Sequence, residues 1–479
     1  MPRRREIPAR ADSPCNIGRA YFFFQNFTVN RAADTPPPPT ALQRINYWWR
    51  RLAAAVLPGR GDSAAGRAHA HLLAQLEALF EDYRAQRGGE TSSRARAERI
   101  AAIYRAADPE QRAAILNLIT RAFAPRREVL DAALGAMQSA ASDDELNHAE
   151  AQMRIALDAP RAHFLTQFNL LPDGVKFLVD LRADLLGLLP REPSLEVLKV
   201  ELDGLLASWF DPGFLELKRI SWQSPALLLE KLITYEAVHP IESWNDLRNR
   251  LDTDRRCYAF FHARMPDEPL IFVEIALLKG VPESVQMLLD QSAPAQDPQA
   301  ADTAIFYSIS NTQRGLRGIS FGNLLLKRVI EDLRRDLPRL KTFATLSPLP
   351  GFRQWLEQAA APGEDHVAPP AALARADWAS DAALAETLRT PLEKLCARYL
   401  LKEKSGTRPL DLVAHFHLDN GARINRLLWL ADTSTRGMQQ SYGMMVSYLY
   451  DLDHVDKNHE RFLHTGQIAA ASRVMRLLG

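Results

Sequence analysis

The feature of this sequence that most constrains its fold is a change of pattern close to residue 210. Between about residues 63 and 209, apolar side chains recur every three or four positions in a background rich in Ala, Leu, Arg and Glu, which is typical of amphipathic helices. After about residue 220, short runs of Phe, Ile, Val and Tyr are bounded by Pro, Gly and Asp, as expected of β-strands. The two patterns predict a helical bundle followed by an α/β domain.

The length of the chain agrees with this division, because 479 residues are about twice what one hydrophobic core usually serves. We predict three regions. Residues 1–62 form a poorly ordered arm, since the proline run at 36–39 excludes a helix and favours extended backbone. Residues 63–209 form the helical domain, whose lack of convergent His, Cys or paired acids indicates a structural or oligomeric role. Residues 210–479 form the α/β domain.

Charge, cysteine content and hydropathy restrict the kind of partner. A formal net charge of +1 gives no global field that would favour nucleic acid. Three cysteines are too few for a disulfide framework or a zinc cluster, and we expect Cys257 and Cys396 to be buried thiols. No stretch approaches the roughly eighteen continuous apolar residues of a membrane span. We expect a small-molecule ligand and a cytoplasmic, bacterial-type protein, with a mitochondrial-type leader in the Arg-rich N-terminus as the alternative.

A candidate binding site lies in the segment AIFYSISNTQRGLRGISFGNLLLKRVIEDLRRDL, residues 304–337. A predicted strand runs into a loop that contains Gly315, Gly318 and Gly322, and the loop opens a predicted helix. Glycines let backbone N–H groups point inward and the helix start adds its positive dipole end, so the loop is suited to bind phosphate. Neither a P-loop motif nor a dinucleotide-binding glycine motif is present, and an ordinary strand-to-helix turn remains the alternative. Charge at the rim of the loop would come from Arg314, Arg317, Lys327 and Arg328.

The loop from Arg317 to Gly322 resembles the coenzyme A-binding loop of GNAT acyltransferases, Gln/Arg-x-x-Gly-x-Gly/Ala, although Ser320 stands where glycine is preferred. With RRCYAFFHARMPDEPLIFVEIALLKG before it and LSPLPGF and VAHFHLDNGARINRLLWLADTSTRG after it, the segment resembles the malonyl-CoA decarboxylase family over about residues 238–450. The resemblance implies an α+β fold, in which a self-associating helical domain precedes a GNAT-like catalytic domain. It also implies decarboxylation of malonyl-CoA to acetyl-CoA and carbon dioxide by a homo-oligomer that needs neither a metal nor an organic cofactor.

The same resemblance implies the site residues. By position, the catalytic serine is Ser347 in LSPLPG and the catalytic histidine is His417 in FHLDNGA. Ser308 in FYSIS and Tyr450 in SYLYDL match positions near the family's active site. The residues implied to bind the coenzyme A part of malonyl-CoA are Arg317, Gly318, Ile319, Ser320, Phe321, Gly322 and Asn323.

The chemistry suits these residue types. Loss of carbon dioxide from a malonyl thioester leaves an enolate, and a hydrogen-bond donor fixed at the thioester oxygen lowers such a barrier by about 3 kcal/mol. The enolate carbon must then be protonated, and imidazole is suited to that task near neutral pH. We expect His417 to be the proton donor. We expect Ser347 to bond the carboxylate or the thioester oxygen and to exchange a proton with His417.

Other interpretations remain open. A serine before proline, as at Ser347, often starts a turn. A predicted strand through AHFHL would place His415 and His417 on one strand face, where one of them is a structural histidine or both are metal ligands, although no Cys or paired carboxylate lies near in sequence. Two further functions fit the pattern: an acyl-CoA-dependent N-acyltransferase on the same fold, and a non-catalytic oligomer that binds CoA esters. Ser320 argues against the first of these.

Overall fold

The computed structural model describes residues 64–85, 89–157, 160–319, 324–359, 370–375 and 377–479. The predicted arm at 1–62 lies outside these residues. Residues 1–68 and 69–479 are two separate units, and the description below concerns the second. Within the described ranges, no helix is both long enough and apolar enough to cross a membrane.

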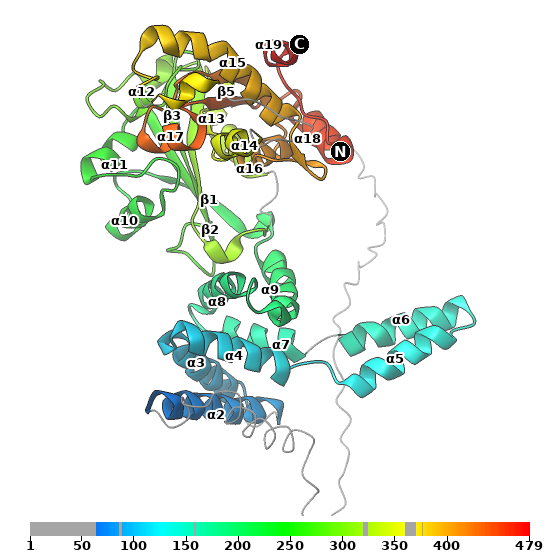
Figure 1. Ribbon diagram of the computed structural model, residues 1–479. Coiled ribbons are helices and arrows are strands. Elements are labelled where there is room, and N and C mark those ends of the chain that lie inside the picture. Colours follow the sequence, from blue (N-terminus) through cyan, green and yellow to red (C-terminus); the bar gives the residue numbers. More distant parts are fainter. Residues whose placement is uncertain (1–63, 86–88, 158–159, 320–323, 360–369, 376) are drawn as a thin grey trace, which may run out of the picture. The chain divides into compact units, whose positions relative to one another are not determined.

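The described residues between 64 and 209 are mainly helical, as the periodicity predicts (Figure 1). A capping box begins α4, in which the Asp108 carboxylate accepts the Gln111 N–H and the Gln111 side chain accepts the Asp108 N–H. In the bundle core the rings of Phe123 and Phe164 stack with 4.3 Å between centroids. The helices are α2 (Ala64–Arg84), α3 (Glu90–Ala106), α4 (Pro109–Ala122), α5 (Arg127–Ser139), α6 (Asp143–Leu157), α7 (Pro160–Thr166), α8 (Gly174–Leu188) and α9 (Glu196–Trp209).

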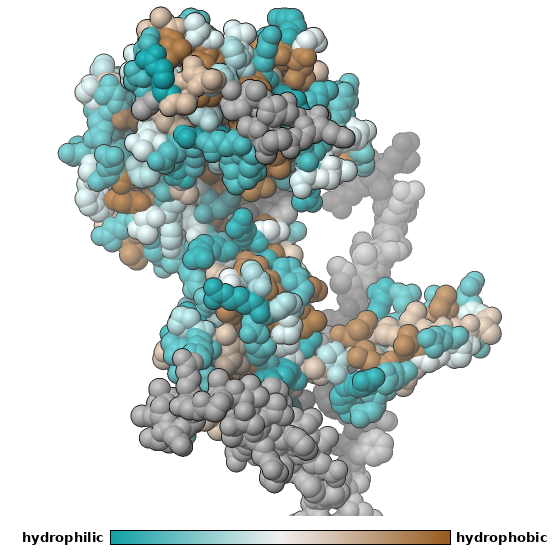
Figure 2. Space-filling view, in the orientation of Figure 1, coloured by the Kyte–Doolittle hydropathy of each residue, from teal (hydrophilic) through white to brown (hydrophobic). Residues whose placement is uncertain are grey.

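Helices α5 and α6 pack against each other and leave large apolar side chains in solvent, which Figure 2 shows as brown areas over this pair. The exposed fractions are 49% for Leu134, 44% for Leu146, 74% for Ile155 and 58% for Leu157. Neighbouring exposed apolar side chains of this kind are typical of protein–protein contact surfaces.

A mixed sheet forms the second part of the chain. Its strands follow the order β1-β2-β3-β4-β5-β10-β6, and β9 pairs with β10. Four apolar runs of the sequence predict strands, at residues 257–263, 269–278, 304–310 and 343–347, and they correspond to β2, β3, β4 and the pair β5 and β6. The strands are β1 (Leu215–Ile220), β2 (Arg255–His262), β3 (Ile271–Leu278), β4 (Thr303–Asn311), β5 (Thr342–Thr345), β6 (Ser347–Pro348), β9 (Arg423–Leu428) and β10 (Met445–Leu449).

Helices cover both faces of this sheet because its strands are apolar on both sides. On β3, Val273 and Ile275 belong to one core with α13 and α15, whereas Phe272 belongs to another with α10 and α11. The apolar spacing of VPESVQMLLDQ, residues 281–291, predicts a helix, of which only α12 is formed. The helices are α10 (Ala226–Tyr235), α11 (Trp244–Arg250), α12 (Gln286–Leu289), α13 (Leu324–Asp336), α14 (Phe352–Ala359), α15 (Ala382–Leu401), α16 (Leu412–Asp419), α17 (Thr435–Ser441), α18 (Val455–Thr465) and α19 (Ser472–Met475).

The sheet changes character between β4 and β5. These two strands are parallel, whereas the other neighbouring strands of the described sheet are antiparallel. Their pairing ends at Phe306 and Thr345, and a bulge interrupts β4 next to Phe306. β4 continues to Asn311, while the chain after β5 pairs with β10 instead. The two strands therefore separate here. The arrangement confirms the predicted α+β fold, a helical bundle followed by a GNAT-like α/β domain.

Candidate active site

Ser347 lies where β5 gives way to β6, and its side chain is only 4% exposed. It pairs with Val446 of β10, and the turn of this segment follows at Pro350 and Gly351, so the backbone of Ser347 belongs to the sheet and not to the turn. The Ser347 hydroxyl donates a 2.8 Å hydrogen bond to Oγ1 of Thr345, which also accepts the N–H of Tyr448 at 3.0 Å. The two hydroxyls meet because residues two apart on an extended chain point to the same side.

The prediction that His415 and His417 share one strand face is wrong. Both lie on α16, whose first turn is capped by Asp411, with its carboxylate accepting the N–H of Ala414 at 2.8 Å. Residues two apart on a helix point to nearly opposite sides. His417 is accordingly buried, while His415 is half-buried and its ring lies 5.9 Å from that of Phe462.

The structure brings Ser347 and His417 together. The Ser347 Oγ lies 2.9 Å from Nε2 of His417, and the other ring nitrogen, Nδ1, lies 2.8 Å from the Tyr450 hydroxyl. The His417 ring also stacks on Tyr448, with 4.4 Å between centroids and 24° between planes. One continuous chain of hydrogen bonds thus runs from Tyr450 through His417 and Ser347 to Thr345, and Tyr448 fixes the plane of the imidazole.

The side chains in this series of hydrogen bonds are uncharged when no ligand is bound. Burial lowers the pKa of His417 to about 3, so the imidazole is neutral around pH 7, and burial raises the pKa of Tyr450. A neutral imidazole has one donor and one acceptor nitrogen. Because Ser347 donates to Thr345, its oxygen is left to accept from Nε2–H, and Nδ1 then accepts from Tyr450. This tautomer, assigned from the hydrogen-bond network, places a transferable proton between His417 and Ser347.

The predicted coenzyme A loop follows β4, and only its first part lies within the described residues. Arg317, Gly318 and Ile319 are described, and Gly318 has a left-handed φ of +84°. Ser320, Phe321, Gly322 and Asn323 lie outside the described residues. Since β4 and β5 are parallel, their C-terminal ends lie at the same edge of the sheet, so this loop and Ser347 follow from neighbouring strand ends.

Two of the four cations expected at the loop rim make other contacts. Lys327 pairs with Asp456, and Arg328 donates to the Leu215 carbonyl oxygen at 3.0 Å. Arg314 and Arg317 are exposed, so of these four cations they are the two best placed to bind a phosphate.

Ser308 lies at the bulge of β4, and its hydroxyl is directed at a carboxylate that the sequence analysis missed. The Ser308 Oγ lies 2.8 Å from both oxygens of Glu236, and Ser310 donates to the same carboxylate at 3.2 Å. Glu236 also accepts the N–H groups of Val238 and His239, each at 2.8 Å. These bonds satisfy the buried carboxylate. The local sequence around Glu236, YEAVHP, does not predict this contact, because the contact depends on tertiary packing.

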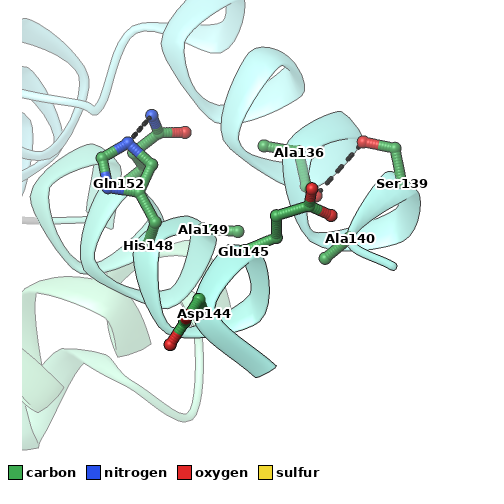
Figure 3. Close-up of a pocket in the computed structure, with 8 residues that line it drawn as sticks. All are labelled: Ala136, Ser139, Ala140, Asp144, Glu145, His148, Ala149 and Gln152. Atoms are coloured by element: carbon green, nitrogen blue, oxygen red, sulfur yellow. Dashed lines mark hydrogen bonds between the residues drawn. The ribbon is translucent and has the colours of Figure 1, made fainter. Parts of the chain in front are cut away.

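A hollow of about 540 Å³ lies between α5 and α6, apart from the residues described above. Its lining consists of three alanines and five polar or charged residues. The polar contacts drawn in Figure 3 are local, such as the 3.0 Å bond between His148 and Gln152 on one helix. The lining residues are Ala136, Ser139, Ala140, Asp144, Glu145, His148, Ala149 and Gln152. This set lacks the buried, convergent polar groups expected of a catalytic site.

Comparisons with known proteins cover both parts of the chain. Residues 213–479 match the family model described as malonyl-CoA decarboxylase C-terminal domain, and residues 123–210 match the N-terminal domain of the same family. The chain is 35% identical over 469 residues to the mitochondrial malonyl-CoA decarboxylase of Anser anser anser, with 89% of this chain and 93% of that protein covered. It is 34% identical to the protein of the same name from Rattus norvegicus, with 78% and 82% covered.

Solved structures of similar proteins belong to the same family. The malonyl-CoA decarboxylase from Rhodopseudomonas palustris is 43% identical, with a TM-score of 0.79, and the match covers 85% of this chain and 99% of that one. The malonyl-CoA decarboxylase from Agrobacterium vitis is 41% identical, also with a TM-score of 0.79, and the match covers 85% of this chain and all of that one, 100%.

Proposed function

The chain belongs to the malonyl-CoA decarboxylase family, a family of carboxy-lyases, and we propose that it converts malonyl-CoA to acetyl-CoA and carbon dioxide. The observation that carries the proposal is the buried contact of 2.9 Å between Ser347 and His417. The two residues are predicted from separate segments of the sequence, LSPLPG and FHLDNGA, and the fold brings them into contact. An uncharged serine–histidine pair is suited to give a proton to carbon.

In the proposed reaction the bond between the carboxylate carbon and the α-carbon breaks, and its electron pair moves into an enolate whose negative charge lies on the thioester oxygen. Carbon dioxide leaves. The enolate carbon then takes a proton supplied by His417, with Ser347 exchanging a proton with Nε2 and bonding the thioester oxygen or the carboxylate. A thioester enolate is a stronger base than an imidazolate, so a neutral imidazole suffices as the acid. Solvent restores the proton after acetyl-CoA leaves.

The direct test is to incubate the purified protein with malonyl-CoA and to follow acetyl-CoA and released carbon dioxide. His417→Ala should abolish turnover and leave coenzyme A binding measurable, because it removes the acid and not the loop at residues 317–323. His415→Ala is the matched control, since this histidine lies on the same helix but points elsewhere, and it should retain activity.

Each contrary result has a meaning. Full activity in His417→Ala would remove this residue as the acid. Saturable binding of malonyl-CoA without turnover by the unaltered protein would favour a non-catalytic CoA-ester-binding role. Acyl transfer to an amine would favour the acyltransferase.

We also propose that the protein is a homo-oligomer, a dimer or a tetramer, whose subunits associate through the helical domain at 63–209, with the catalytic domain at 210–479. The exposed apolar side chains of α5 and α6 support this assembly. We further propose a role in fatty acid metabolism, and the cytoplasmic location stays a prediction.

A further inference from the structure

Arg182, on helix α8, reaches from the helical domain to the loop that follows β4. Its side chain is only 2% exposed. One guanidinium nitrogen, Nη1, donates to the carbonyl oxygens of Gly315 and Arg317, at 2.5 and 3.0 Å, while Nε donates to Asp203 at 2.7 Å. A buried guanidinium with a carboxylate partner and two backbone acceptors is a fixed group, because moving it would leave several polar atoms unbonded.

A second contact fixes the same loop independently. At Gly315 an added Cβ would lie 1.7 Å from the carbonyl oxygen of Val179 on α8, which no side chain tolerates. The 3₁₀ turn at Arg314–Leu316 therefore lies directly on the backbone of α8. A glycine at this position is required by the close approach of two backbones.

The hydrogen bonds to Arg182 also set the direction of the loop's amides. The described peptide bonds are trans, so the C=O and the N–H of one peptide unit point to opposite sides. With the Arg317 carbonyl turned to Arg182, the N–H of Gly318 points away from α8. Gly318 has a φ of +84°, the left-handed conformation that anion-binding loops use.

We propose that Arg182 is a positioning residue for the substrate: it holds the loop at residues 315–318 so that the Gly318 amide faces the phosphates of the CoA ester. The proposal rests on the proposed function, in which this loop binds the coenzyme A part of malonyl-CoA. It gives the helical domain a part in substrate binding in addition to assembly. The groups proposed for proton transfer lie on β6, α16 and the segment after β10, so they do not depend on this contact.

Arg182→Gln tests the proposal. The variant keeps a polar group but loses the charge and most donors, and Asp203 keeps a partner because Lys199 lies 3.1 Å from it. We expect KM for malonyl-CoA, and Kd for coenzyme A by calorimetry, to rise about tenfold or more, with kcat within about twofold of the unaltered protein. Arg182→Lys, which keeps the charge and reaches fewer acceptors, should recover part of the loss.

Two glycine variants give a second test and its matched control. Gly315→Ala should raise KM in the same way, because the new Cβ forces the loop off α8. Gly204→Ala, at an exposed position on α9, meets no atom within 4 Å and should change neither KM nor kcat. The pair also keeps the proposal testable if Arg182→Gln does not fold, which circular dichroism would reveal.

Hydrogen–deuterium exchange of residues 313–319 without ligand separates this proposal from the proposed function. Faster exchange in Arg182→Gln and Gly315→Ala, together with the rise in KM, supports the positioning role. Unchanged exchange, unchanged KM, or a loss confined to kcat overturns it. If the unaltered protein neither binds coenzyme A nor consumes malonyl-CoA, the proposed function fails, and exchange alone still reports whether Arg182 holds the loop.

Discussion

At the scale of single residues, burial is the property that distinguishes His417 from an ordinary histidine. Its pKa is lowered from 6.5 to about 3, with desolvation as the cause. The side chain is therefore neutral from about pH 4 upward, and its protonation state does not change through the physiological range.

The first prediction concerns pH and stability. Because the folded pKa of His417 lies below the unfolded one, the unfolded state binds more protons between about pH 3 and pH 6.5. The free energy of unfolding that this residue contributes is complete above pH 6.5 and falls as the pH drops through this window, by up to about 1.4 kcal/mol per pH unit. Denaturant titrations at several pH values should show a flatter profile for His417→Gln than for the unaltered protein. Identical slopes would show that His417 is not buried as a neutral group.

The second prediction concerns Thr345, which accepts bonds from both Ser347 and Tyr448. In Thr345→Val these donors lose their acceptor, and the Ser347 hydroxyl is no longer held in one orientation beside His417. Loss of a buried hydrogen bond costs about 1–3 kcal/mol, so kcat should fall by about tenfold to a hundredfold with KM unchanged.

Thr345→Ser keeps the acceptor oxygen and serves as the control, with near-normal kcat. Equal kcat in both variants would show that the orientation of the Ser347 hydroxyl is not limiting.

The sequence predicts Ser347 and His417 as site residues, and the structure places them in contact, but the sequence gives no sign of the residues that support them. The two residues stand in recognisable motifs, whereas Thr345 and Tyr448 look like ordinary strand residues in FATLS and VSYLY. Their roles depend on the pairing of β10 with β6 and on burial. Local sequence patterns predict neither this pairing nor the burial.

At the scale of elements, the apolar runs predicted β2, β3 and β4 well, because β-branched and aromatic side chains suit a sheet that is buried on both faces. The sequence predicts a strand where the structure has α16. Its sequence LVAHFHLD alternates apolar and polar residues over a short stretch, and the signal that decides is the Asp411 side chain at its start.

The third prediction tests that cap. Asp411 is buried, accepts the Ala414 N–H, and also accepts the hydroxyl of Tyr399 at 3.2 Å. Asp411→Ala should lower the free energy of unfolding by about 1–3 kcal/mol, since it removes a cap and leaves a buried hydroxyl without its acceptor. Asp411→Asn retains one acceptor oxygen for the Ala414 N–H, and its NH2 group can donate to the Tyr399 hydroxyl oxygen, so it should lose less. Chemical denaturation measures both variants, and equal stability would show that the cap does not hold α16.

At the scale of the whole molecule, the division near residue 210 followed from the change of pattern, because helical and strand periodicities are properties of long segments. The contact of Arg182 with Gly315 and Arg317 did not, since it joins residues more than a hundred positions apart. Contacts between layers are set by three-dimensional packing, which a single sequence does not display.

The fourth prediction concerns assembly through α5 and α6. Replacing Ile155 and Leu157 by Asp should shift the protein to smaller species in sedimentation velocity, because the exposed apolar surface becomes charged. Met287→Asp is the control, since Met287 is 63% exposed but lies on α12 of the other domain. An unchanged sedimentation coefficient in the double variant would exclude this surface as the subunit contact.

The dry surroundings of the Ser347–His417 pair have an energetic consequence for any anionic acyl group that enters. A carboxylate placed there would lose its hydration and would meet hydroxyls and a neutral ring in place of a counter-ion. Burying the charged group would therefore cost free energy. Release of the carboxylate as carbon dioxide, which is uncharged, would remove that cost. The free energy for bringing the ion in must come from the distant nucleotide part of the ligand. If malonyl-CoA binds as proposed, contacts with its coenzyme A part offset the cost of placing its carboxylate beside Ser347 and His417.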